Sequence, residues 1–429
     1  MRTHPPRRGF SLVELVIAMA IGAVVVAGAT ALMLSQQRNF QSTSGDRALQ
    51  EAARIALGRV SEDLRQAGFG VDPALVFDFG NMTNVRMDRA AKGATFDVAS
   101  ADQACTDTPV ACRDSTLIPD EISFLSRDPG FGPHPLLAGV NAASTELKIF
   151  GPVKTTLGIG QLLQVLCYGG TMTWAYVQVS GATTTDAKGD VTVPILAGTT
   201  AFPNQNSSLD EGCFSSVASY LPTGKIDPDS VTSAAKVFKV DRFRYFVQRY
   251  DDAGAVKGWG TAGARPYLML DQGLKDGPLP GGAAILSVVA PDVEDLQLAY
   301  IFPNAAADQL VGATAGTALA ASDKGIDLAP PSPSPAFSDD PAAPTRLTHH
   351  PGNIRGVRVI LVVRTPSADP RIPGDPVPAA GNRAAAPRTD GFRRLLVETT
   401  VPVRNLGMLA PYYPSYDLAG ATQLNAGGG

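Results

Sequence analysis

The sequence predicts an α+β protein, in which one long N-terminal helix is followed by a mostly antiparallel β-sheet domain. Apolar residues recur at helical spacing up to residue 67, and after Gly70 the pattern changes to the alternation that is typical of strands. No long helical pattern interrupts the later strands, which argues against a parallel α/β fold. The 43 glycines and 34 prolines among 429 residues also favour many turns over a helical bundle.

The first helix begins with a run of membrane-spanning length. Residues 12–34 carry no charge except Glu14, and at about 1.5 Å per residue they would span ~35 Å, a full hydrocarbon thickness. Arg2, Arg7 and Arg8 precede this run without any acidic residue. The positive-inside rule therefore predicts a single-pass protein with a cytoplasmic N-terminus and the rest of the chain on the other side of the membrane.

Glu14 requires an explanation because a charge at the bilayer centre costs roughly 2.5–3.5 kcal/mol on insertion scales. A buried carboxylate is tolerated when an opposite charge offsets its desolvation. The polar break Arg7-Arg8-Gly9 precedes the apolar run, whereas a secretory signal has its cleavage site after that run. We therefore expect cleavage on the cytoplasmic side, which leaves the helix on the mature chain. The alternative is an uncleaved signal anchor whose Glu14 reaches the headgroups.

The stretch Gly9-Phe10-Ser11-Leu12-Val13-Glu14 resembles the processing motif of type IV prepilins and type II secretion pseudopilins. The resemblance implies that prepilin peptidase cleaves between Gly9 and Phe10 and methylates the new amino group of Phe10. It also implies that Glu14 faces the N-terminal ammonium of an adjacent subunit and so acts in assembly. The predicted domains are a leader peptide at residues 1–9, a pilin helix at residues 10–68 with its transmembrane segment at residues 12–34, and a β-rich domain at residues 69–429.

The helix is expected to continue beyond the membrane to about residue 67. Its outer part carries one apolar stripe with spacings of three and four, formed by Leu49, Ala52, Ala53, Ala56, Val60, Leu64 and Ala67. Gly68, Gly70 and Pro73 end the pattern. The stripe is predicted to pack on the following domain.

The remaining chain contains many candidate strands. They are predicted at residues 121–125, 146–150, 162–168, 173–179, 191–196, 236–250, 284–289 and 295–301. The two clearest runs are residues 356–364 and 393–405, which are expected to be antiparallel neighbours. In the second run, Leu395, Val397, Thr399, Val401 and Val403 share one face, and Leu396, Glu398 and Arg404 share the other.

Two segments read as loop insertions because neither has apolar periodicity. Residues 305–350 are rich in Ala, Pro, Ser and Asp, and residues 366–390 carry six prolines. Both are expected to be long and exposed.

Four cysteines, an even number, favour two disulfides in an exported chain. Cys105 and Cys112 would close a short loop, while Cys167 at a strand end and Cys213 in a loop would form a second bond. In a cytosolic chain the four would instead be ordinary thiols.

The order of these parts is similar to the PilW group of minor pilins. The matching stretches are residues 49–70, 293–302, 356–364 and 393–405. The resemblance implies a minor pilin at or near the tip of a type IV pilus, which primes assembly with other minor pilins and the major pilin. It would reside in the inner membrane before assembly and in the extracellular pilus afterwards. The alternatives are a GspJ-like pseudopilin of type II secretion and a membrane-anchored extracellular adhesin or enzyme.

No catalytic motif supports an enzyme. The chain has no P-loop, no GxSxG and no HExxH, so we expect no catalytic residues and no cofactor. His349 and His350 lack Cys or Glu residues at metal-ligand spacing, so no metal site is predicted. The acidic stretch at residues 249–260 lacks the ligand pattern of a calcium loop and is interpreted as a hairpin turn at residues 252–254.

Three arginines, Arg242, Arg244 and Arg249, alternate with aromatic residues along one predicted strand. Such a strand could stack and neutralise a nucleic acid. However, Arg249 falls on the opposite face from the other two, and the net charge of −4 gives no electrostatic case for a nucleic-acid partner. The arginines are therefore expected on a solvated outer face.

Overall fold

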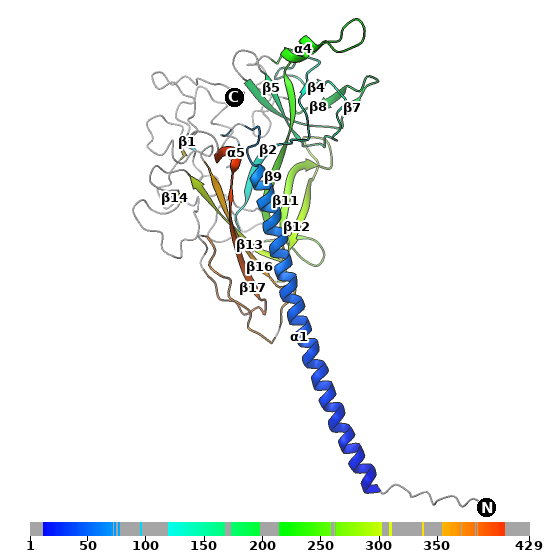
Figure 1. Ribbon diagram of the computed structural model, residues 1–429, viewed down its shortest axis with the longest axis vertical. Helices are drawn as coiled ribbons and strands as arrows, with labels where there is room; N and C mark the ends of the chain where they lie inside the picture. Colours follow the sequence, from blue (N-terminus) through cyan, green and yellow to red (C-terminus); the bar gives the residue numbers. More distant parts are fainter. Residues whose placement is uncertain are drawn as a thin grey trace, which may run out of the picture.

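The computed structural model describes residues 12–71, 73, 76–77, 95–96, 119–167, 173–197, 214–258, 261, 263–302, 309–310, 337–338, 354–369, 371–381, 383 and 385–407. A long helix, α1 (Leu12–Gln66), projects from a β-rich domain (Figure 1). The sheets are antiparallel throughout the described pairings. This arrangement confirms the predicted α+β fold.

The largest sheet has eight strands and is organised around one 15-residue strand, β9. Its main path runs β12-β11-β9-β5-β6, and β2, β3 and β10 also pair with β9. The bounds are β2 Ile122–Arg127, β3 His134–Pro135, β5 Leu162–Cys167, β6 Thr173–Gln178, β9 Lys236–Tyr250, β10 Val256–Lys257, β11 Arg265–Lys275 and β12 Ala284–Pro291. The hairpin predicted at residues 252–254 is confirmed, because Tyr250 pairs with Val256 across a turn in which Gly254 has φ +79°.

A second sheet has four strands in the order β14-β13-β16-β17, and two smaller sheets have the orders β4-β8-β7 and β1-β15. The bounds are β1 Thr95–Phe96, β4 Glu146–Ile149, β7 Thr184–Thr185, β8 Val191–Pro194, β13 Val293–Phe302, β14 Gln309–Leu310, β15 Phe337–Ser338, β16 Gly356–Arg364 and β17 Arg394–Pro402. Two short helices are α4 Pro228–Ser233 and α5 Arg404–Gly407.

The outer half of α1 is docked on the sheets through the predicted apolar stripe. All seven stripe residues are buried in one hydrophobic cluster with strands of the two larger sheets: Leu49, Ala52, Ala53, Ala56, Val60, Leu64 and Ala67. The helix contacts β12 of the eight-stranded sheet and β13, β16 and β17 of the four-stranded sheet. The helix therefore belongs to the core of the domain.

Strands β16 and β17 are antiparallel neighbours in continuous register from Gly356↔Pro402 to Arg364↔Arg394, as predicted. The alternation along β17 is also confirmed. Val401 and Val403 are buried in the cluster that contains α1, whereas Leu396 packs on the opposite face of the sheet.

One central strand, β11, is absent from the predicted set. The segment contains Pro266, Asp271 and Gly273, which disfavour a strand in isolation. In the folded chain β11 pairs with both β9 and β12, and its register with β12 shifts after Asp271. Gly273 has φ +77° and its N–H donates to Asp271 Oδ1 over 2.7 Å. Pairing on both sides stabilises a strand that its local sequence does not favour.

Most described residues of the segment 366–390 are exposed or half-buried, but two of them are buried, which the expectation of an exposed loop did not include. Val377 and Ala380 are both 2% exposed, and Ala380 packs against Ile360, Val362 and Leu396. The physical reason is that β16 is apolar on both faces, so its outer face needs cover. In the other predicted insertion, residues 305–350, only β14 and β15 lie within the described residues.

Candidate functional site

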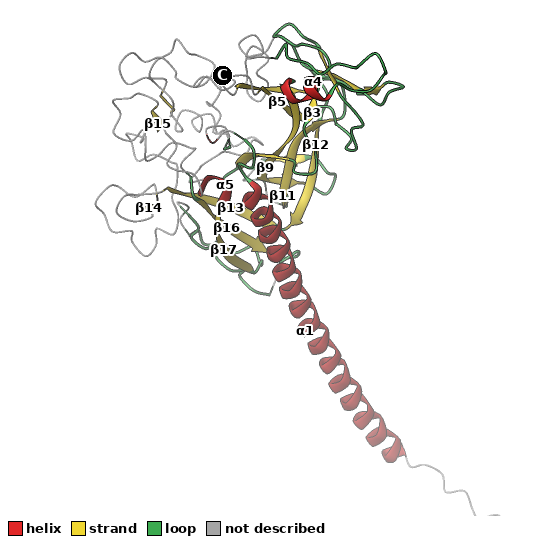
Figure 2. Ribbon diagram, turned by 45° about the horizontal axis from the view of Figure 1, so that its top comes forward, coloured by secondary structure: helices red, strands yellow, loops and turns green. Residues whose placement is uncertain are grey.

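The candidate site is the inner half of α1, which projects from the domain. Leu12–Gln37 has a mean hydropathy of 2.5, and none of its most apolar stretch is buried. Figure 2 shows this half extending away from every strand. Large apolar side chains are exposed all around it: Leu12, Val13, Leu15, Val16, Ile17, Met19, Ile21, Val24, Val25, Val26, Leu32, Met33 and Leu34. A helix that is apolar all round requires a lipid or protein environment.

Glu14 lies in the first turn of this projecting half and is exposed. It is the only ionisable residue between Leu12 and Gln37, so the described part of the projecting half offers it no counter-ion. The first turn is a favourable place for a carboxylate because the helix dipole is positive there. Gly9 and Phe10 lie outside the described residues, so their roles in cleavage and methylation stay predictions.

The C-terminal end of α1 is fixed to the domain by hydrogen bonds that the sequence pattern did not reveal. Gly68 follows the helix with φ +79°, and its N–H donates to the carbonyl of Leu125 over 2.9 Å. The carbonyl of Gln66 accepts from Ser126 Oγ at 2.8 Å and from Asn405 Nδ2 at 3.2 Å. Carbonyls that a helix end leaves free are thus satisfied by two distant segments.

A buried polar contact also joins the docked half to the sheet. Tyr245 Oη on β9 donates to Asp63 Oδ2, and Arg59 Nε lies 3.1 Å from the same oxygen. Burial raises the pKa of Asp63, which the hydrogen bond from Tyr245 and the charge of Arg59 only partly offset. Burial and the bond to Asp63 raise the pKa of Tyr245. This contact fixes the rotation of α1 on the domain.

Two of the three β9 arginines expected on a solvated outer face, Arg244 and Arg249, have acidic neighbours. Arg244 donates from Nε and Nη2 to Glu121 Oε2 at 3.0 and 2.6 Å. Arg249 is largely buried, with Nη2 3.7 Å from Glu294 Oε1, and burial lowers its pKa to about 10. The prediction of a solvated outer face is therefore wrong for Arg249, because its side chain is buried next to Glu294 of β13.

The other predicted site residues fall mostly outside the described residues. Cys167 ends β5, is fully buried and is disulfide-bonded, but Cys105, Cys112 and Cys213 are not described, so their connectivity stays a prediction. His349 and His350 are also not described. Within the described part of the chain, no group of three His, Cys, Asp or Glu residues could hold a metal ion.

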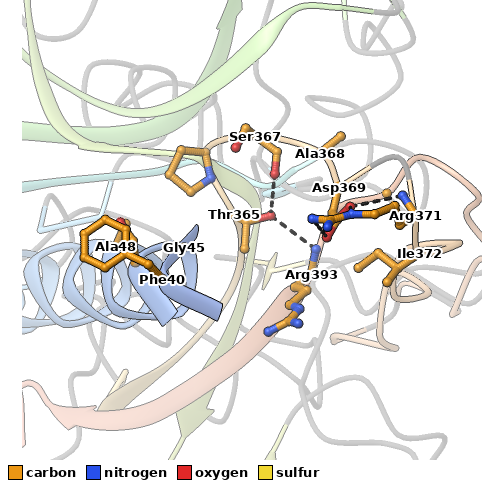
Figure 3. A pocket seen from close by; sticks show the side chains of 13 residues that line it. Phe40, Gly45, Ala48, Thr365, Ser367, Ala368, Asp369, Arg371, Ile372 and Arg393 are labelled. Carbon is orange, nitrogen blue, oxygen red and sulfur yellow. Dashed lines mark hydrogen bonds and ion pairs between the residues drawn. The ribbon is translucent and has the colours of Figure 1, made fainter. Parts of the chain in front are cut away.

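A pocket of about 470 Å³ lies where α1 leaves the domain. One wall is α1 itself, with Phe40, Gly45 and Ala48, and the other walls come from the connection between β16 and β17 (Figure 3). Arg371 donates from Nε to Asp369 Oδ1 at 2.8 Å and from Nη2 to Asp369 Oδ2 at 3.0 Å. No sequence pattern indicates this pocket, because its walls are more than 300 residues apart in the chain.

An ion pair joins α1 to the β16–β17 connection beside the pocket. Arg393 Nη1 lies 2.8 Å from Asp46 Oδ2, and the N–H of Arg393 donates to Thr365 Oγ1 at 3.3 Å. The hydrogen bond with Arg371 is the main reason that the pKa of Asp369 is lowered.

Comparison with known proteins gives one match. Residues 5–30 match the family model of the prokaryotic N-terminal methylation motif. No curated protein and no solved structure matches the chain. The matched residues overlap the apolar helix segment Leu12–Gln37, whose length and composition fit a single-pass membrane anchor. The motif and this helix together support a type IV pilin-like or pseudopilin protein.

Proposed function

We propose that the chain is a PilW-like minor pilin, which prepilin peptidase cleaves between Gly9 and Phe10 and methylates on Phe10. The observation that carries the proposal is that the methylation motif coincides with the exposed apolar half of α1. In this proposal the domain is periplasmic before assembly and extracellular in the pilus. Other minor pilins and the major pilin are its partners, and its position is at or near the tip.

The proposed mechanism is a difference in stability between the membrane and the filament. In the membrane, Glu14 is a costly charge without a counter-ion on its own helix segment. In a filament, the methylated amino group of an adjacent subunit supplies that counter-ion. Gly22 and Gly28 have open space where a side chain would project, which favours close packing of a second helix.

The docked half of α1 couples this assembly step to the domain. Because Leu49 to Ala67 form part of the core, the helix and the domain move as one unit. Insertion of the projecting half into a filament therefore fixes the orientation of the domain. The proposal gives the chain a structural role rather than an enzymatic one.

The first experiment replaces Glu14 in the full chain. Glu14→Ala should still be cleaved, so mass spectrometry should find a mature chain that begins at methylated Phe10, but its recovery in sheared filaments should fall at least tenfold. Glu51→Ala is the matched control, since Glu51 is an exposed acid on the docked half of the same helix. Normal recovery of Glu14→Ala, or a mature chain that begins at Met1, would contradict the proposal.

A GspJ-like pseudopilin is the second candidate, because the matched motif is common to pilins and pseudopilins. Deletion of the gene in its native host separates the two. Loss of surface pili with normal protein secretion supports the minor pilin, whereas loss of secretion with normal pili supports the pseudopilin.

A further inference from the structure

We propose that the pocket between α1 and the β16–β17 connection binds the zwitterionic headgroup of a phospholipid from the leaflet into which the domain faces. The headgroup carries a phosphate and an ammonium, as in phosphatidylethanolamine. The inference depends on α1 being a membrane anchor and not on filament assembly. Its test can therefore fail independently of the proposed function.

The pocket lies at the height of the headgroups. The apolar segment ends at Gln37, and the wall on α1 runs from Phe40 to Ala48, three to eleven residues later. At 1.5 Å per residue this wall begins about 4.5 Å and ends about 16.5 Å beyond the apolar segment. The polar layer on each side of a bilayer is roughly 5–8 Å thick. The entrance beside Phe40 is thus within reach of a headgroup.

The length of the apolar segment brings the pocket closer still. Its 26 residues extend about 39 Å, compared with a hydrocarbon core of about 30 Å. A helix that is too long for the bilayer tilts. Tilting lowers the end of the domain from which α1 projects toward the membrane surface.

The charged groups of the pocket match both charges of the ligand. Arg371 and Asp369 line the pocket as a pair, and their side chains are 48% and 32% exposed. The guanidinium fork of Arg371 suits a phosphate, and the Asp369 carboxylate suits an ammonium. An exposed ion pair contributes little to stability, so both groups are available to exchange partners. Phe40, which is 75% exposed, lines the pocket at the end of the α1 wall nearest the apolar segment, where it would contact the apolar part of the lipid.

The carboxylate wall is held in place by the backbone. Asp369 N–H donates to the carbonyl of Gly391 at 2.8 Å. Gly391 has φ +74°, and a Cβ at this position would lie 2.7 Å from the carbonyl oxygen of Asp369. A larger residue therefore does not fit there, and the close approach keeps Asp369 beside Arg371. The site does not require a large rearrangement to receive a headgroup.

The test measures lipid retention by the full chain. The protein is reconstituted in bilayers of phosphatidylethanolamine, phosphatidylglycerol and an uncharged diglycosyl diacylglycerol in equal amounts, and native mass spectrometry then counts the lipids that remain bound. The wild type should retain phosphatidylethanolamine at least fivefold over the other two. The double variant Asp369→Ala/Arg371→Ala should lose this preference.

The matched control is Arg358→Ala/Glu398→Ala, which removes a surface ion pair of 2.8 Å on the four-stranded sheet and should leave the preference unchanged. Unfolding midpoints of both variants establish that the fold is retained. Equal retention of the three lipids, or an unchanged preference in the Asp369/Arg371 variant, would overturn the proposal. Displacement of the lipid by inorganic phosphate alone would also overturn it, since the site would then recognise a free anion.

Discussion

Truncation of Leu64 to alanine tests whether the docked half of α1 is an integral part of the domain core. Leu64 is fully buried in the cluster that also contains Phe124 and Trp174. Removal of a fully buried leucine side chain to Cβ costs about 2–5 kcal/mol, because apolar contact is lost and a cavity remains. Alanine is the better helix former, so intrinsic helix propensity cannot explain a loss. We expect a loss near 3 kcal/mol, or about a hundredfold in the folding equilibrium.

Chemical denaturation of the full chain in detergent measures this loss. The fluorescence of Trp174, which is buried in the same cluster, reports the separation of α1 from the sheets. Ile55→Ala is the control, because Ile55 is 47% exposed on the same helix and its truncation should cost at most about 0.5 kcal/mol. If Leu64→Ala unfolds at the wild-type midpoint, or if both variants are destabilised equally, the helix is not part of the core.

Two further predictions concern buried charges. Burial raises the folded-state pKa of Asp63 above its unfolded value. The stability that this group contributes is therefore present at pH below about 3.8 and is lost as the pH rises through the folded pKa. As the pH is raised from 4 to 7, the denaturation midpoint of the wild type should decrease relative to that of Asp63→Asn, and a constant difference between the two would contradict the assignment. Arg394→Ala should cost about 3–5 kcal/mol because it removes the partner of buried Glu294 at 2.6 Å and leaves it only the more distant Arg249 at 3.7 Å, whereas Arg358→Ala at a surface pair should cost at most about 1 kcal/mol. Similar midpoints for these two variants would refute this reasoning.

The regular local patterns of the chain were informative about the fold. Helical spacing identified the buried stripe of α1, while a continuous apolar run identified β16 and alternation identified its partner β17. Both patterns are visible because each element buries only one face or lies in a continuous apolar run. Strand β11 lacks such a pattern, since Pro266 and Gly273 interrupt it, and its pairing partners lie elsewhere in the chain.

The features of the candidate site also fall into two groups, those that follow from consecutive residues and those that depend on distant contacts. The apolar run and the single acid Glu14 are properties of consecutive residues, so the sequence was sufficient to predict an anchor and an assembly residue. The environment of Arg249 is different in kind. Its side chain lies near Glu294 on β13 and Arg364 on β16, which are far along the chain and leave no trace in the local sequence pattern of β9.

The sequence by itself determined that the chain has an apolar N-terminal helix with one carboxylate and a β-rich remainder, because these features follow from the order of neighbouring residues. Only the tertiary structure decided at which point α1 changes from a projecting helix to a part of the hydrophobic core, and which segment covers the four-stranded sheet. It also decided that Phe40 and Asp369 line one pocket. The physical reason is that burial and pairing depend on contacts between distant residues, whose free energies no local pattern contains.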